Sequence, residues 1–153
     1  MKTIKTIIEQ HSFTKHLDPK YLHLLEKSAT YERFGAQQTV FQESFEADRF
    51  YFIHRGRVAL HTFAPGQGVV TIQTIGPNET LGWSWLFPPH RWHFSAIAVE
   101  PTEAVALCAA TMRQEMEENH DFGYAIAMRV GQLILERLQA TRTRMLEVYN
   151  VAG

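Results

Sequence analysis

The sequence predicts a mainly β domain with flanking α-helices, a small barrel or jelly roll, and two observations carry this prediction. Its middle part holds several short segments rich in β-branched and aromatic residues, separated by Gly and Pro. Its C-terminal part repeats apolar residues at helical steps of three and four. A chain of 153 residues can bury a single core, so we expect one domain over residues 1–153.

Short helices are expected in residues 1–30, before the barrel. Asp18 suits a helix N-cap and Pro19 suits the first helical position. The leucines that follow keep helical spacing, which predicts a helix that ends near Ser28.

The barrel is expected over residues 31–110. Residues 49–63 form two apolar runs broken at Gly56, which predicts two strands. A Pro- and Gly-rich turn leads to residues 69–75, whose alternation of apolar and polar residues predicts the partner strand. Two further strands are expected at residues 95–99 and 104–108.

Two C-terminal helices are expected within residues 111–150, a short one over 111–119 and a long one over 121–149. One apolar stripe of the long helix consists of Ala127, Val130, Ile134, Leu138, Thr141, Met145 and Val148. A second line beside it consists of Phe122, Ile126 and Leu133. If one stripe packs on the barrel, the other is exposed to solvent unless a second chain buries it. We therefore expect a homodimer through this helix. In the alternative, both stripes form one wide face against the barrel.

Charge and cysteine content exclude several classes of protein. The formal net charge is -1, so the chain has no general basic surface for nucleic acid or anionic membranes. No apolar run has the length of a signal-peptide core or a membrane span, so we expect a cytoplasmic protein without membrane attachment. Cys108 is the only cysteine, which fits a reducing compartment, and its apolar surroundings predict a buried, inert thiol.

The stretch GWSWLFPPHRWHFSA, residues 82–96, contains all three tryptophans, two of the eight histidines and a Pro-Pro pair. Such a concentration of rings has two explanations. The rings line a ligand pocket, or they fill the mouth of the barrel in place of one.

The order of these elements resembles the cyclic-nucleotide-binding domain of Crp/Fnr-type regulators. FYFIHRGRVAL (residues 50–60) is similar to the strand–Gly–strand signature of that family. FGAQQTVFQE (34–43) resembles the strand pair before it, and ERLQATRTR (136–144) the long helix after the barrel. The resemblance implies a double-stranded β-helix, or jelly-roll barrel, with short N-terminal helices and a long C-terminal helix.

In that family the tryptophan-rich stretch would be the phosphate-binding cassette, a Gly-Glu-x-x-Leu segment with a short helix and a closing Arg-Ser-Ala. Gly82, Leu86 and the pair Ser95-Ala96 match this frame. Trp83 stands in place of the Glu that accepts the ribose hydroxyl, and Phe94 in place of the Arg that clamps the phosphate. Upstream, Ser44 replaces a family Gly.

Other groups can take over these roles. The guanidinium of Arg91 is displaced by three residues, the N–H groups of Ser84 and Trp85 are able to hold an anion, and Trp83, Trp85 and Trp92 are able to stack on a flat ligand. The resemblance also implies that Thr141 and Arg142 approach the nucleotide. The predicted ligand-binding residues are therefore Gly82, Trp83, Ser84, Trp85, Leu86, Arg91, Phe94, Ser95, Ala96, Thr141 and Arg142.

Three functions follow as hypotheses. The first is a sensor that binds a small ligand, a cyclic nucleotide or another anionic or aromatic molecule, between barrel and C-terminal helix and signals to a protein partner. The second is a ligand-free interaction protein with an aromatic plug. The weaker third is a cupin-like metalloenzyme that uses His54, His61, His90 and His93.

Two classes of activity are not expected. The chain has no nucleophile elbow, Walker loop or dinucleotide fingerprint, so we expect no enzyme activity. The sequence indicates no cofactor apart from the cyclic nucleotide, or other small anionic or aromatic ligand, of the first hypothesis. Because the chain stops at Gly153, before the family's helix-turn-helix, we expect no DNA binding by this chain alone.

Overall fold

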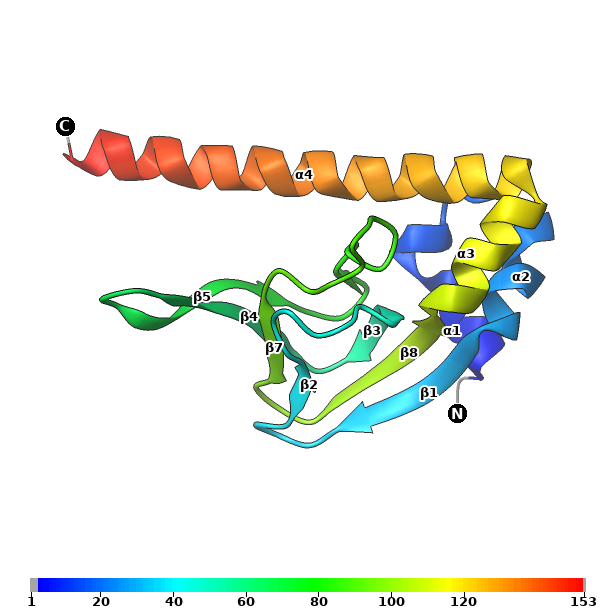
Figure 1. The fold of residues 1–153 in the computed structure, drawn as a ribbon, viewed down its shortest axis with the longest axis horizontal. Coiled ribbons are helices and arrows are strands. Elements are labelled where there is room, and N and C mark those ends of the chain that lie inside the picture. The colour runs from blue at the N-terminus through cyan, green and yellow to red at the C-terminus, as the bar shows by residue number, and fades with distance from the viewer. Residues whose placement is uncertain (1–2, 153) are drawn as a thin grey trace. The chain divides into compact units, whose positions relative to one another are not determined.

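The computed structural model describes residues 3–152 and confirms the mainly β fold with short N-terminal helices and a long C-terminal helix (Figure 1). The chain divides into two compact units between Glu115 and Met116. The first unit contains every strand and the N-terminal helices, and the second contains the long helix.

The strands of the first unit form two antiparallel four-stranded sheets (Figure 1). The first sheet has the order β1 (Ala29–Phe34), β8 (Thr102–Cys108), β3 (Arg49–Arg55) and β6 (Thr80–Leu81). The second has the order β2 (Thr39–Phe41), β7 (Ser95–Ala98), β4 (Val58–Ala64) and β5 (Gly68–Ile75). The predicted strands are all present, and these two sheets form the expected jelly roll.

The break between β3 and β4 requires a glycine. Gly56 has φ +93°, a left-handed conformation that side chains disfavour. A Cβ there would also overlap Thr102 and the carbonyl of Pro101. Thr102 pairs with Phe34 across β1 and β8, which explains why β8 begins earlier than the predicted Ala104.

Aromatic rings dominate the core of the first unit. The rings of Phe50 and Phe52 lie 5.2 Å apart, and Phe13 lies 5.1 Å from Phe50. Residues 104–107 of β8 are all buried: β8 is a central strand between β1 and β3, and α1 packs on it.

The N-terminal helices are α1 (Ile4–Gln10), η1 (Ser12–Thr14), η2 (Pro19–Tyr21) and α2 (Leu22–Lys27). The predicted cap is confirmed, because the Asp18 carboxylate accepts the N–H of Lys20 at 3.0 Å. The helical segment ends at Lys27, beside the predicted Ser28.

The predicted C-terminal helices appear as α3 (Ala109–Glu118) and α4 (His120–Ala152). Burial on α4 differs from both predicted stripes, since the fully buried residues Phe122, Ile126 and Val130 come from both lines. Every side chain described from Leu138 onward is exposed. No helix in the described part of the chain is long and apolar enough to cross a membrane.

Cys108 differs from the prediction of a buried, inert thiol. It ends β8 and is only half-buried. A hydrogen bond with the Thr111 side chain, followed by one with the Thr111 backbone, lowers the pKa of the thiol below its usual value. The strand ends at this residue, so its side chain reaches the surface instead of continuing the buried run before it.

Candidate functional site: the tryptophan-rich loop

The tryptophan-rich stretch is the loop between β6 and β7, and we call residues 82–94 the tryptophan-rich loop. All of its residues are described, and none belongs to a helix. The N–H of Leu86 donates to the carbonyl of Trp83 at 3.0 Å, which makes one turn. The short helix that the resemblance implies is therefore reduced to a single turn, without the aligned N–H groups of a helix N-terminus.

The ring of Trp92 lies against Gly82, the first residue of the loop. Gly82 has φ +76°, and a Cβ at this position would overlap the six-membered ring of Trp92. The same indole stacks on Phe41 of β2 with ring centroids 3.7 Å apart and planes 7° apart. Trp92 is 2% exposed, so the protein's own side chain fills the space beside the cassette glycine.

Trp85 belongs to the core. It is 0% exposed, and its indole stacks on Phe50 at 4.9 Å. Its carbonyl accepts a hydrogen bond from Nη1 of Arg113 at 2.6 Å. Its Nε1 is buried and has no hydrogen-bond partner among the described residues. Trp85 therefore presents no open ring face to a ligand, whereas Trp83 is only half-buried.

Arg91 binds the chain itself. Its Nη1 donates to the carbonyl of Ser44 at 3.0 Å, and its backbone forms a β-bridge with Glu46. The N–H of Ser44 donates to the carbonyl of Trp92 at 2.8 Å, so two loops are joined. Ser44 has φ +74°, which explains why the family uses Gly at this position.

The last residues of the cassette frame, 94–96, also have contacts within the protein. The hydroxyl oxygen of Ser95 accepts the N–H of Glu43 at 2.9 Å, and the Glu43 carboxylate accepts the hydroxyl of Thr62 at 2.8 Å. Ala96 is buried, and the ring of Phe94 lies 5.8 Å from Phe41. Phe94, at the position that the resemblance gives to a phosphate-clamping Arg, thus lies beside Phe41, and Ser95 binds the backbone of Glu43.

The predicted ligand residues belong to two different units of the chain. Residues 82–96 share one loop and the strand after it, and Ser84 within them is buried. Thr141 and Arg142 lie on the exposed part of α4 in the second unit, where the Thr141 hydroxyl donates to the carbonyl of Arg137 at 2.9 Å.

Two partners of the loop were missed from the sequence. Phe41 stacks on Trp92, and Arg113 of α3 holds the carbonyl of Trp85. Phe41 lies in the strand pair that resembles the family, yet nothing in that pattern indicates a ring partner. In residues 3–152, no three His, Cys, Asp or Glu side chains are grouped so that they could hold a metal ion.

Comparison with known proteins gives one family. A family model described as cyclic nucleotide-binding domain matches residues 31–119. No curated protein matches the sequence.

Solved structures share the fold. A putative cyclic nucleotide-binding protein from Geobacter metallireducens is 23% identical, with a TM-score of 0.80 over 90% of this chain and 99% of its own. The Thermus thermophilus catabolite activator protein is 22% identical, with a TM-score of 0.70 over 87% of this chain and 61% of its own. The sensor domain of the regulator DNR from Pseudomonas aeruginosa is 16% identical, with a TM-score of 0.70 over 88% of this chain and 91% of its own.

Proposed function

The chain belongs to the cyclic nucleotide-binding domain family, and we propose that it is a regulatory domain of that family whose cassette takes no cyclic nucleotide in the usual way. The observation that carries this proposal is the ring of Trp92, which lies against Gly82, stacks on Phe41 and is 2% exposed. Of the two explanations for the tryptophan-rich stretch, we therefore propose that its rings fill the mouth of the barrel and do not line a ligand pocket.

Electrostatics support the same proposal. A buried phosphate needs a compensating cation or several hydrogen-bond donors. Arg91 is exposed and hydrogen-bonded to Ser44, and position 94 carries a phenyl ring. A cyclic nucleotide in the cassette would have to displace an indole, and would find no arginine at the family position.

A thermal-shift titration tests the proposal directly. Cyclic AMP at a thousand times its dissociation constant adds about 4 kcal/mol to the stability of a domain that binds it. In a domain of this size that corresponds to a rise in Tm of roughly 10 °C. We expect no rise with cyclic AMP or cyclic GMP. A saturable rise that Trp83→Ala or Arg91→Ala abolishes would instead establish the ligand-binding cassette.

We further propose that the regulatory output passes through protein contacts of α4, beginning with a second copy of this chain. Eight large apolar side chains in the described part of α4 are 49–70% exposed. Leu146 and Val148 stand apart from the other six, which are Tyr124, Met128, Leu135, Leu138, Met145 and Tyr149. Their sequence numbers follow a heptad repeat that Gly131 and Arg142 complete. An exposed apolar seam with this period fits a two-stranded coiled coil.

Sedimentation of matched variants tests the dimer. Leu138→Glu places a charge on the seam and should give a monomer, whereas Gln139→Glu places the same charge one position off the seam and should leave a dimer. A monomeric wild-type chain, or a dimer that Leu138→Glu leaves intact, would overturn the assignment. We place this dimer in the cytoplasm, since a lone cysteine suits a reducing compartment.

A further inference from the structure

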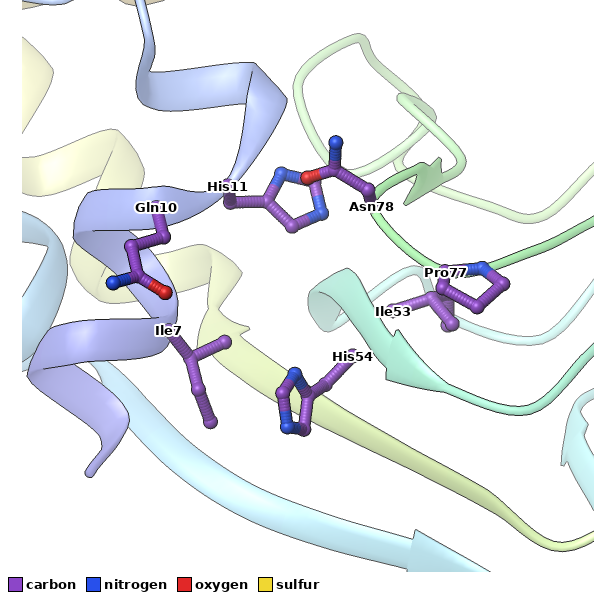
Figure 2. Close-up of a pocket in the computed structure, with 7 residues that line it drawn as sticks. All are labelled: Ile7, Gln10, His11, Ile53, His54, Pro77 and Asn78. Carbon is purple, nitrogen blue, oxygen red and sulfur yellow. The ribbon is translucent and has the colours of Figure 1, made fainter. Parts of the chain in front are cut away.

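A second candidate site lies away from the tryptophan-rich loop, at a hollow of about 280 Å³ between α1, the end of β3 and the turn that precedes β6 (Figure 2). Part of its wall is aliphatic and comes from Ile7, Ile53 and Pro77. Ligand pockets have volumes of roughly 300–1,000 Å³, so this hollow, at the lower edge of that range, has room only for a small molecule.

Four polar side chains complete the wall: Gln10, His11, His54 and Asn78. They come from three separate segments of the chain, and Figure 2 shows them around the hollow. An apolar wall with a few converging polar groups is the usual composition of a small-molecule site.

Two irregular backbone positions supply part of this polar wall. The pairing of β3 with β8 shifts between Ile53 and Arg55, so His54 is the extra residue of a β-bulge. Bulges re-aim a side chain and are common beside functional sites. Asn78 has φ +68°, a conformation that asparagine tolerates better than most residues. Both departures from regular structure bring a polar side chain to the same hollow.

His11 forms a rigid, neutral wall. Its Nδ1 accepts the N–H of Phe13 at 3.1 Å, so its Nε2 carries the proton that is donated to the carbonyl of Glu79 at 3.2 Å. The imidazole is 3% exposed and stacks on Phe52 at 4.6 Å. Because both nitrogens are engaged in this way, His11 shapes the hollow as a neutral ring.

Asn78 is held in place from the same side. Its Oδ1 accepts the N–H of Ser12 at 2.8 Å, and its carbonyl accepts the Ser12 hydroxyl at 2.5 Å. With the amide oxygen used, the NH₂ group is what Asn78 contributes as a donor. The turn and the N-terminal segment are thus fixed to each other before any ligand arrives, which lowers the cost of binding.

The chemistry of the wall selects the class of ligand. None of the described lining residues is a Lys, Arg, Asp or Glu, so these residues offer a charged ligand no counter-charge. Gln10 and Asn78 carry flat amide side chains, the kind of group that pairs with the edges of heterocyclic bases.

We propose that this hollow binds a small, uncharged heteroaromatic molecule, of the size of a nucleobase or nicotinamide. The inference goes beyond the proposed function and does not depend on it, because none of its lining residues belongs to the tryptophan-rich loop. The site is nevertheless close to that loop in sequence, since Asn78 is followed by β6 and then by Gly82.

NMR titration of the full chain with adenine and with nicotinamide tests the proposal. We expect saturable shifts of the His54 imidazole and of the Gln10 and Asn78 side-chain amides, with a Kd in the millimolar range or below. His54→Ala and Gln10→Ala should each raise that Kd about tenfold or more. Gln10 is exposed, so its variant should fold normally. His61→Ala, which changes a half-buried histidine of the other sheet, is the matched control and should leave the Kd unchanged.

Each contrary result overturns the inference. Absence of shifts with both probes up to their solubility would exclude the class of ligand. Shifts that persist unchanged in both His54→Ala and Gln10→Ala would place the binding elsewhere. Shifts confined to Trp83 and its neighbours would refute this site and count separately against the closed cassette, so the two proposals fail in distinguishable ways.

Discussion

Replacement of Trp92 by alanine should strongly destabilise the first unit. A tryptophan buries about 150–250 Å², and Trp92 is 2% exposed, so truncation to alanine removes nearly all of that buried area from the core. At about 25 cal/mol per Å², burial of this area stabilises the folded state by roughly 4–6 kcal/mol. This value is an upper bound, because the unfolded chain is partly compact. Measured Trp→Ala losses of about 3–5 kcal/mol agree with this range.

The stack on Phe41 belongs to the same loss. Its ring centroids are 3.7 Å apart, and aromatic pairs add about 0.5–1.5 kcal/mol beyond area burial. We therefore expect Trp92→Ala to lower the free energy of unfolding by about 4 kcal/mol. Domains are stable by about 5–15 kcal/mol, so the variant should still fold, with a Tm lower by roughly 10 °C.

Urea unfolding, followed by circular dichroism, measures this loss. His93→Ala is the matched control, because His93 is the exposed neighbour of Trp92 and should change stability by no more than about 0.5 kcal/mol. A loss below about 1 kcal/mol for Trp92→Ala would show that the indole is not packed on Phe41 and Gly82, since a packed indole cannot be removed at so small a cost.

Two further predictions concern titratable groups. Burial, followed by the charge of Glu32, raises the pKa of Tyr51 above its usual 10.0, so its stabilising contribution is fully present below pH 10 and is lost as pH rises toward the folded-state pKa. Alkaline unfolding followed by phenolate absorbance should therefore begin at higher pH in Tyr51→Phe; an identical onset in both proteins would contradict this. Thr111→Val should raise the pKa of Cys108 and slow its alkylation by iodoacetamide several-fold at neutral pH, and an unchanged rate would contradict the role of Thr111.

Local sequence patterns predicted most of the fold, because apolar residues recur with one period in strands and with another in helices. The break at Gly56 and the cap at Asp18 are short-range features, and both were readable from the residue type alone. The β-bulge at His54 was not, since it depends on the register of β3 against β8, far away in sequence.

The site was less predictable than the fold, for a related reason. The frame of Gly82, Leu86 and Ser95 could be found from its spacing, and the loss of the arginine at position 94 was visible. The stack of Trp92 on Phe41 joins residues far apart in the chain, and the hydrogen bond from Arg91 to Ser44 does the same. No pattern within the loop distinguishes a ring that awaits a ligand from a ring that already has a partner.

A double-mutant cycle shows whether the ring of Trp92 fills the cassette beside Gly82. In the wild-type background, Gly82→Ala lowers the free energy of unfolding for two reasons: the positive φ of residue 82 and the overlap of the new Cβ with the indole. In the Trp92→Ala background only the cost of the positive φ remains. We predict that the destabilisation caused by Gly82→Ala falls by more than about 1 kcal/mol in the Trp92→Ala background. An equal cost of Gly82→Ala in both backgrounds would show that the two residues do not touch, and would contradict the account of a closed cassette.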